Sequence, residues 1–470
     1  MSELKKSIGP WGLVAIGAAG VIGSSYLYLA SSLFDNFTLG GVVIGMVLAT
    51  FLAACVAVGI GELAAMFPRA GGEFVYSYIS FGRFPAFLVG WLLLATYTGI
   101  VGFYITATGR LISTFVDGLD VIPLYDIGGG VMYLPILLIG LVLVGGTVLV
   151  NWFGTELSFK LQLVLFIILI AIGLLIVVVA FGAGSYENTR PAFGDLSPVE
   201  GGASAIAFVI PAMGFLTGFS VVAVLSEEAD VRPNQLGRLI VLSVLIAGLF
   251  YAIIFYATGW IIPWRQTAQL ENGTVEAFSV AGFSNLSTLA FIAGVIGIVT
   301  TVISVFASAS RLAFSLARVG LLPTVFGHVD GKTGVPRNAI LLIASMGLIV
   351  GLIGPDAIQW ILNVGGFFVA AIWVLTVLAF YTVRRNYPKA RRPYRVRYSY
   401  LPALGGVGGL ILVALTLAPA SPLAFQSPFE YGLVIVFLAL GVVLYGLAPK
   451  NQSKEQSLKG MLGDYTKQIE

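Results

Sequence analysis

The chain has 470 residues, of which 58% are hydrophobic and only 10% are charged, whereas about 25% of the residues in an average soluble domain are charged. This composition excludes an ordinary soluble enzyme. The net charge of +3 is too small to suggest a nucleic-acid partner. With one histidine and one cysteine, neither an intramolecular disulfide nor a metal site of several histidines can form, and we expect no resident cofactor.

Apolar stretches recur along the whole chain, and about 20 residues are enough to cross roughly 30 Å of hydrocarbon. In chain order, the predicted spans are 11–34, 39–66, 85–114, 131–150, 160–183, 203–226, 239–263, 285–316, 338–354, 357–381, 400–418 and 430–448. They predict an all-α integral membrane protein with 12 transmembrane helices. The first span is too long for a cleaved signal peptide, and the second follows almost at once.

The basic residues indicate the orientation, because lysine and arginine stay preferentially on the cytoplasmic side of short loops. With the N-terminus inside, every basic residue except Arg110, Arg190 and Arg265 falls on a predicted inner segment. We therefore expect a multi-pass protein of the plasma membrane with both termini in the cytoplasm. The basic run 384–397 is either a positive stop at an inner helix end or a site for lipid head groups.

Two predicted spans carry small residues or proline at their centres. These residues are Gly17, Gly20 and Gly23 in the first span, and Pro211, Gly214 and Gly218 in the sixth. Glycine costs about 1 kcal/mol in a helix interior relative to alanine, and proline about 3 kcal/mol. Close helix packing would explain any single glycine, but the pairing predicts that both spans are discontinuous.

The spacing of the two interruptions suggests an inverted repeat. Five crossings separate them, and because five is odd, a copy of a five-helix unit is inverted across the membrane. Backbone groups freed at mid-membrane persist only beside a ligand, an ion or water. Amide groups at a half-helix N-terminus favour a carboxylate, and exposed carbonyl groups favour an ammonium group. The pattern therefore predicts a small amphoteric solute as the ligand.

Three stretches resemble signatures of the amino acid-polyamine-organocation (APC) superfamily of permeases. The most specific is 61–76, with the sequence GELAAMFPRAGGEFVY; the others lie at 310–339 and 218–238. The resemblance implies secondary transport of amino acids or amines by alternating access. It also implies two inverted five-helix repeats and two further C-terminal helices. The expected segments are an N-terminus at 1–10, repeats at 11–183 and 203–381, a helix pair at 398–448 and a flexible tail at 449–470.

The two interrupted spans depart from the family pattern. Ser25 replaces the glycine whose amide would face the substrate carboxylate, and Ser220 stands where many members carry glutamate. The missing carboxylate favours a neutral amino acid over a cationic substrate. Phe215 and Phe219 are expected to cap the substrate, with Tyr97 on the pocket wall. The expected substrate-binding residues are Val21, Ile22, Gly23, Ser24, Ser25, Tyr26, Tyr97, Phe215, Leu216, Thr217, Gly218, Phe219 and Ser220.

The coupling ion is open between H+ and Na+. Several proton-coupled relatives carry a lysine in the fifth helix, where this chain has Leu169. Without it, Na+ could lie between the first and eighth spans, bound by oxygen ligands. The candidate ligands are the carbonyl groups of Ala18 and Val21 and the hydroxyl groups of Thr300, Thr301 and Ser304. The alternative is that these hydroxyl groups bond to their own or a neighbouring helix.

Four charged residues near inner helix ends are candidates for an inner gate: Glu62, Glu227, Glu228 and Arg311. Glu62 is expected to pair with Arg69 or another inner arginine. Glu227 and Glu228 are expected to pair with Arg311 or Arg318. For Glu62 this pairing is the alternative to a role in the gate, and for Glu227 and Glu228 the alternative is simple solvation.

The sequence therefore predicts a secondary transporter for amino acids, with a lipid bilayer around it and a neutral amino acid as its substrate. The oligomeric state is left open. An exchanger of amino acids, amines or polyamines is the rival within this class. A sensor of the same fold that binds such a ligand without transporting it is the rival outside it. No phosphate-binding loop with a lysine is found, which argues against an ATP-driven pump.

Overall fold

The computed structural model describes residues 8–23, 25–113, 115–127, 130–153, 155–331, 334–355, 357–421, 423–425, 427–449 and 453–469. Within these ranges, ten helices are long and apolar enough to cross a membrane. They are α3 (Ala30–Met66), α5 (Arg83–Ser113), α6 (Leu134–Trp152), α7 (Thr155–Ala183), α8 (Pro198–Leu216) with its extension to Val224, α10 (Pro233–Ile261), α13 (Ser284–Arg318), α15 (Ala357–Asn386), α16 (Tyr400–Leu417) and α17 (Pro428–Leu447). Two shorter apolar helices, α1 (Pro10–Val21) and α14 (Arg337–Gly351), lie within or near the predicted spans 11–34 and 338–354.

Local sequence explains where several helices begin. Proline occupies the first turn of α1, α8 and α10, where its missing N–H costs no helical hydrogen bond. Ser197 and Ser427 begin α8 and α17 with capping boxes, in which the serine and a glutamate three residues later bond each other's backbone. Thr38 has a left-handed φ of 60° inside α3, so the boundary between the first two predicted spans falls there.

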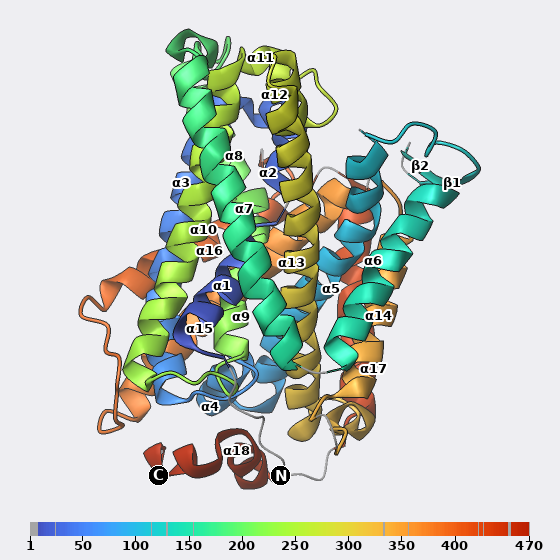
Figure 1. The fold of residues 1–470 in the computed structure, drawn as a ribbon. Coiled ribbons are helices and arrows are strands. Elements are labelled where there is room, and N and C mark those ends of the chain that lie inside the picture. The colour runs from blue at the N-terminus through green and yellow to red at the C-terminus, as the bar shows by residue number, and fades with distance from the viewer. Residues whose placement is uncertain are drawn as a thin grey trace.

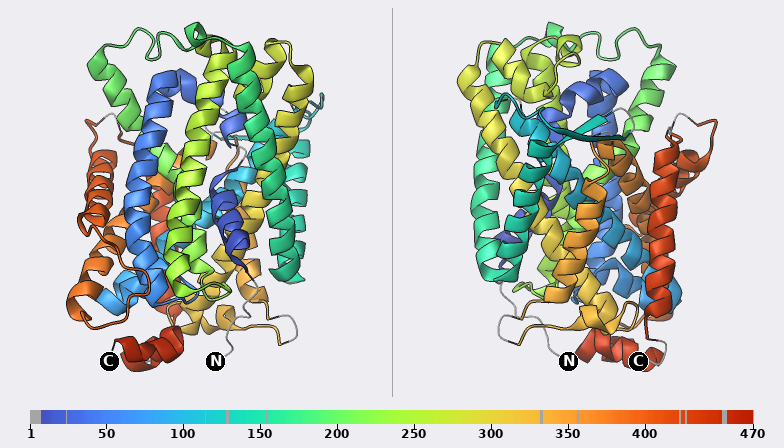
Figure 2. Two further views of the ribbon diagram at one scale, coloured as in Figure 1. Left: turned by 60° about the vertical axis from the view of Figure 1, so that its left-hand side comes forward. Right: turned by 90° about the vertical axis from the view of Figure 1, so that its right-hand side faces the viewer.

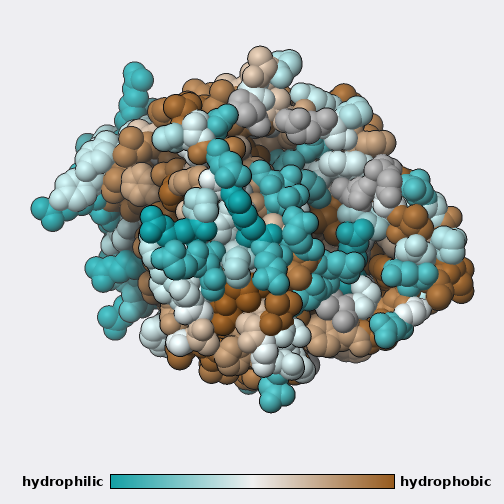
Figure 3. Space-filling view, turned by 90° about the horizontal axis from the view of Figure 1, so that it is seen from above, coloured by the Kyte–Doolittle hydropathy of each residue, from teal (hydrophilic) through white to brown (hydrophobic). Residues whose placement is uncertain are grey.

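The long helices run side by side, with α1 and the short helix α2 (Ser25–Tyr28) among them (Figure 1). One end of the molecule carries α11 (Trp264–Thr267), α12 (Gly273–Val280) and a hairpin of β1 (Pro123–Ile127) and β2 (Gly130–Tyr133). The antiparallel hairpin pairs Pro123 with Tyr133, so the all-α prediction needs this small correction. Seen from this hairpin end, hydrophilic residues gather over the middle and at the left edge, while hydrophobic residues lie along much of the remaining margin (Figure 3).

The opposite end carries the short helix α4 (Glu73–Phe81), and both chain termini lie there (Figure 2). We call it the α4 end. The tail that we expected to be flexible instead forms α18 (Lys454–Leu462) and a 3-10 helix, η4 (Gly463–Gln468). Its Met461 and Leu462 are fully buried, and the Leu462 carbonyl accepts a hydrogen bond from Nε of Arg69 at 3.0 Å. Apolar burial therefore overrides the polar composition of the tail.

Candidate substrate site

The first interrupted segment is broken. Helix α1 ends at Val21, Ile22 has a non-helical ψ of 86°, and the chain becomes helical again at Ser25. The backbone N–H of Ile22 still reaches the Ala18 carbonyl at 2.6 Å. Ser24 and the side chain of Ser25 lie outside the described residues, so their predicted contacts with substrate stay predictions. The break leaves backbone groups of Val21 and Gly23 outside a regular helix.

Tyr251 of α10 bridges this break. Its hydroxyl donates to the Val21 carbonyl at 3.0 Å and accepts from the Gly23 amide at 3.3 Å. The Tyr251 side chain is 1% exposed, so these bonds are made away from water. The Gly23 amide also donates to the Val21 carbonyl at 2.9 Å, so the hydroxyl adds a second bond to each of these two buried backbone groups. Tyr251 was missed in the sequence because nothing in an apolar helix links a tyrosine to a break more than two hundred residues earlier.

The second interrupted segment differs from its prediction, because it stays wound. Helix α8 continues through a 3-10 turn, η2 (Thr217–Phe219), into α9 (Ser220–Val224). The Thr217 hydroxyl donates to the carbonyl groups of Met213 and Gly214 at 3.2 and 3.0 Å. The tighter 3-10 winding and this side-chain bond keep carbonyl groups of the turn occupied. Pro211 lies inside α8 without ending it.

The two segments meet through glycine. A β-carbon at Gly218 would overlap the backbone of Gly20, and a β-carbon at Gly20 would lie 3.3 Å from the Gly218 carbonyl oxygen. A β-carbon at Gly23 would overlap the hydroxyl of Tyr104. These glycines therefore allow close backbone approach, which the sequence alone could not distinguish from helix unwinding.

A small cavity lies beside the break. Its free volume is about 30 Å³, which is room for about one water molecule. Its apolar lining includes Ile100, Phe103, Phe215, Ile361 and Leu362. The polar side chains that line it are Thr96, Tyr104, Tyr251 and Thr301. Among the described residues, the cavity is lined by no acidic or basic side chain.

The predicted substrate-binding residues divide into two groups in the structure. Val21 and Phe215 line the cavity, and Gly23 and Gly218 pack directly around the break. The others are buried but do not line this cavity: Ile22, Tyr26, Tyr97, Leu216, Thr217, Phe219 and Ser220.

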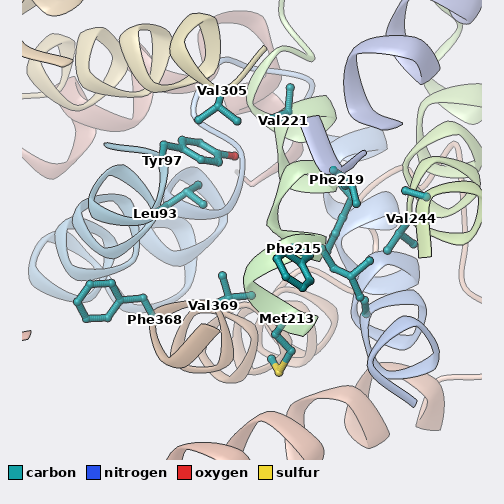
Figure 4. Close-up of a cluster of buried hydrophobic side chains, with 14 of the residues drawn as sticks. Leu93, Tyr97, Met213, Phe215, Phe219, Val221, Val244, Val305, Phe368 and Val369 are labelled. Carbon is teal, nitrogen blue, oxygen red and sulfur yellow. The ribbon is translucent and has the colours of Figure 1, made fainter. Parts of the chain in front are cut away.

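The two phenylalanines expected to cap the substrate point to different partners. Phe215 stacks on Tyr251 with ring centroids 5.6 Å apart. Phe219 packs 6.2 Å from Trp373 instead. Figure 4 shows both rings in the buried cluster, with the Tyr97 hydroxyl directed from α5 toward the segment that carries Phe219 and Val221. The two rings therefore have different aromatic partners, and their shared capping role stays a prediction.

The candidate cation ligands form a hydrogen-bonded contact between α13 and α1. The hydroxyl of Thr301 donates to Ala19 O and that of Ser304 to Ile16 O, both at 2.9 Å. These carbonyls are not the predicted ones: Ala18 O accepts from Ile22, and Val21 O accepts from Tyr251. Thr300 bonds within its own helix, to Gly297 O at 3.0 Å. The geometry matches the helix-contact alternative, while binding of Na+ stays a prediction.

An ion-pair layer lies at the α4 end; we define it as Arg69, Glu227, Glu228, Arg311 and Arg318. Glu227 lies 3.3 Å from Arg318 and 3.9 Å from Arg69, and Glu228 lies 3.1 Å from Arg311. Both carboxylates are almost fully buried, and burial raises the pKa of Glu228 while Arg311 opposes that shift. The predicted pairs of Glu227 and Glu228 are thus present.

Glu62 belongs to a different cluster. Its carboxylate binds Arg384 at 2.6 Å and Arg392 at 3.2 Å, and it accepts the Val396 amide at 2.7 Å. The expected pairing with Arg69 or another inner arginine is therefore present, and the partners are Arg384 and Arg392, since Arg69 is directed to Glu227 and the C-terminal segment. The structure places Glu62 outside the ion-pair layer, where it anchors the basic segment 384–397.

Comparison with known proteins identifies the family of this fold. The sequence model of the family described as "Amino acid permease" matches residues 8–444. The chain belongs to the amino acid permease family. This family lies in the APC superfamily, so the permease is a multi-pass membrane protein and a transporter by family, not an enzyme.

Three relatives illustrate the range of named substrates. The branched-chain amino acid permease BcaP of Bacillus subtilis is 23% identical over 96% of this chain and 95% of the relative. The methylthioribose transporter of Bacillus subtilis is 24% identical over the same shares. The cationic amino acid transporter 4 of Mus musculus is 24% identical over 77% of this chain and 58% of the relative.

Proposed function

We propose that the permease is a secondary active transporter of neutral amino acids that works by alternating access. The observation that carries this proposal is the cavity beside the α1–α2 break. Apolar and hydroxyl side chains line it together with backbone groups, and it has no charged lining residue among those described. In the proposed architecture, twelve helices form two inverted five-helix repeats and a C-terminal pair, with the α4 end in the cytoplasm.

The break offers partners for both charged groups of an amino acid. The Gly23 amide suits a carboxylate, and the Val21 carbonyl suits an ammonium group. In the described conformation, the Tyr251 hydroxyl occupies both. The cavity of about 30 Å³ is smaller than any amino acid, so binding requires the Tyr251 and Phe215 side chains to move. Substrate would then take over the bonds that Tyr251 makes.

The named relatives bear differently on the substrate. A branched aliphatic side chain suits the apolar lining of Ile100, Ile361 and Leu362, in agreement with the named substrates of BcaP. A cationic side chain would need a carboxylate partner in the membrane, and none of the described lining residues supplies one. We therefore propose branched-chain amino acids as the substrate class.

Transport by the purified protein in liposomes tests this proposal. Radiolabelled L-leucine should enter, and unlabelled isoleucine and valine should compete for entry, while arginine and putrescine should not. Methylthioribose belongs in the same panel because a relative is named for it. Failure of all neutral amino acids to enter or compete would overturn the proposal. Competition by arginine alone would identify a cationic substrate instead.

The same liposomes separate the rival functions. Strict dependence on internal amino acid would identify an exchanger, and binding without any flux would identify a sensor. Stimulation by an inward Na+ gradient that is lost in Thr301→Ala would support the Na+ site.

A further inference from the structure

Glu73 is a buried carboxyl group that neither the substrate site nor the ion-pair layer uses. It is the first residue of α4, which is not among the candidate membrane spans. Its side chain is 0% exposed, and neither carboxyl oxygen has a hydrogen-bond partner among the described residues. Carboxyl groups in such surroundings are normally paired or neutral. An unpaired buried carboxyl therefore needs an explanation.

The connector before Glu73 presses α4 against α9. Gly71 and Gly72 have left-handed φ values of 117° and 54°, which glycine adopts without a steric penalty. A β-carbon at Gly72 would lie 3.2 Å from the Val224 amide nitrogen, and the Gly71 amide donates to the Val224 carbonyl at 3.4 Å. The position of Glu73 is therefore tied to the end of the second interrupted segment.

Glu73 interacts electrostatically with three residues that carry hydroxyl groups. Ser220 of α9 interacts with its carboxyl group, and the carboxylate affects the tyrosines Tyr97 of α5 and Tyr76 of α4 electrostatically. The hydroxyls of both tyrosines are buried and have no partner among the described residues. Helix α15 also packs on α4, through a bond from Ser80 to Ala379 O. In the described part of the chain, no arginine or lysine pairs with Glu73, since Arg69 is directed to Glu227.

These surroundings disfavour the charged form of the group. Burial raises the pKa of Glu73 to about 7, and the Ser220 hydroxyl opposes the shift. Because its pKa is raised, the protonated carboxyl group stabilises the conformation in which α4 packs on α9, fully so at pH values below the ordinary pKa of a glutamate. That stabilisation is lost as the pH rises through about 7. The packing of α4 on α9 is thus favoured at acidic pH and weakened at alkaline pH.

The position relative to Ser220 suggests the role. The described lining of the cavity supplies no carboxyl group, whereas Glu73 is a fully buried one held against α9 by the Gly71 and Gly72 contacts. We propose that Glu73 is the proton-binding site that couples transport, a carboxyl group placed beside Ser220 by α4. It holds a proton while α4 is packed on α9. When the connector moves away and water enters, the O–H bond breaks, the carboxylate remains and the proton passes to cytoplasmic water.

This inference rests on the proposed transport function, and Glu73→Gln tests it. Glutamine keeps the shape of the protonated acid but cannot release a proton. One proton per substrate supports about tenfold accumulation per unit of pH gradient. Wild-type protein in liposomes should show leucine accumulation driven by an acidic exterior. Glu73→Gln should lose that accumulation and its pH dependence, while exchange of labelled for unlabelled leucine continues at near wild-type rate.

A second buried carboxyl group provides the matched control. Glu430 is 1% exposed, but it accepts hydrogen bonds from Asn363 and from the Ser427 amide. Glu430→Gln should leave proton-driven accumulation unchanged. Accumulation by Glu73→Gln equal to that of wild type would overturn the inference. So would wild-type leucine entry that ignores the pH gradient, although this result would leave the permease function intact. Absence of any amino acid flux or binding would instead overturn the proposed function.

Thermal unfolding in detergent provides a readout that does not depend on transport. The wild-type melting temperature should fall as the pH rises through about 7, and Glu73→Gln should flatten this dependence relative to Glu430→Gln. If Glu73→Gln does not fold, a pH-sensitive dye inside liposomes that contain the wild-type protein provides the test. Acidification of the interior during leucine entry would support proton coupling. Entry without proton movement overturns it.

Discussion

The segments around Gly23 and Gly218 both carry glycines at their centres, but their backbone conformations differ. Between α1 and α2 the helix stops at Val21 and resumes at Ser25, whereas α8 passes into α9 through a 3-10 turn. The first segment has a tyrosine from α10 that binds the freed Val21 carbonyl and Gly23 amide. The second bonds its own carbonyl groups through Thr217. Small residues thus permit a break, and a hydrogen-bond partner from another helix makes it persist.

The contrast has a functional side as well. In the proposed function, the Val21 and Gly23 backbone groups at the break bind the zwitterion, while the wound segment places Gly218 directly against Gly20. The first segment would then supply the binding groups, and the second the close packing beside them. Substitutions in the first segment should therefore impair substrate binding, and substitutions in the second should impair folding.

The largest effect is expected from Gly218→Ala. The new β-carbon would overlap the backbone of Gly20, and a backbone cannot rotate away as a side chain does. Overpacking of this kind costs about 1–3 kcal/mol or more, so we expect little folded protein by size-exclusion chromatography. Gly146→Ala is the control, because a β-carbon there meets nothing within 4 Å. Wild-type yield and activity of Gly218→Ala would show that the segments do not touch.

Gly23→Ala should have the next largest effect. Its β-carbon would overlap the end of the Tyr104 side chain, which can shift, so the protein should fold. Leucine uptake should fall about tenfold or more because the added group lies at the binding amide. Combining it with Tyr104→Phe removes the overlapping hydroxyl and should recover part of the uptake. A double variant no better than Gly23→Ala would contradict the contact.

Tyr251→Phe should have a smaller effect, on stability and on leucine binding. It removes the Tyr251 bonds to the Val21 carbonyl and the Gly23 amide, which still bond each other at 2.9 Å, and each lost hydrogen bond contributes about 0.5–1.5 kcal/mol of stability. The melting temperature without substrate should fall. Saturating leucine should then stabilise this variant more than wild type, since substrate no longer displaces a hydroxyl. Equal stabilisation of both proteins would mean that leucine and Tyr251 do not compete.

The smallest effect is expected from Thr301→Ala. The variant loses one hydrogen bond between α13 and the Ala19 carbonyl, a net contribution of about 1 kcal/mol. Uptake should change little if the hydroxyl only joins two helices. A loss of Na+-stimulated uptake would instead assign it to a cation site.

Much of the helical architecture follows from the sequence, because long apolar runs and charge placement reflect the membrane itself. The interruption near Gly23 was predicted, but the winding of 217–219 was not, since the Thr217 bonds depend on the local turn. Hydrogen-bond and ion-pair partners that lie far apart in the sequence also could not be predicted. Tyr251 beside the break and Arg384 beside Glu62 are set by packing that no local pattern encodes. The packing of the C-terminal segment, through Met461 and Leu462, also could not be predicted from its polar composition.

We propose that a neutral amino acid takes the place of the Tyr251 hydroxyl at the α1–α2 break. A structure determined experimentally with saturating L-leucine would test this replacement. We expect the leucine carboxylate at the Gly23 amide, the ammonium group at the Val21 carbonyl and the Tyr251 hydroxyl moved off both. Leucine bound elsewhere, or bound while Tyr251 still bridges Val21 and Gly23, would contradict it.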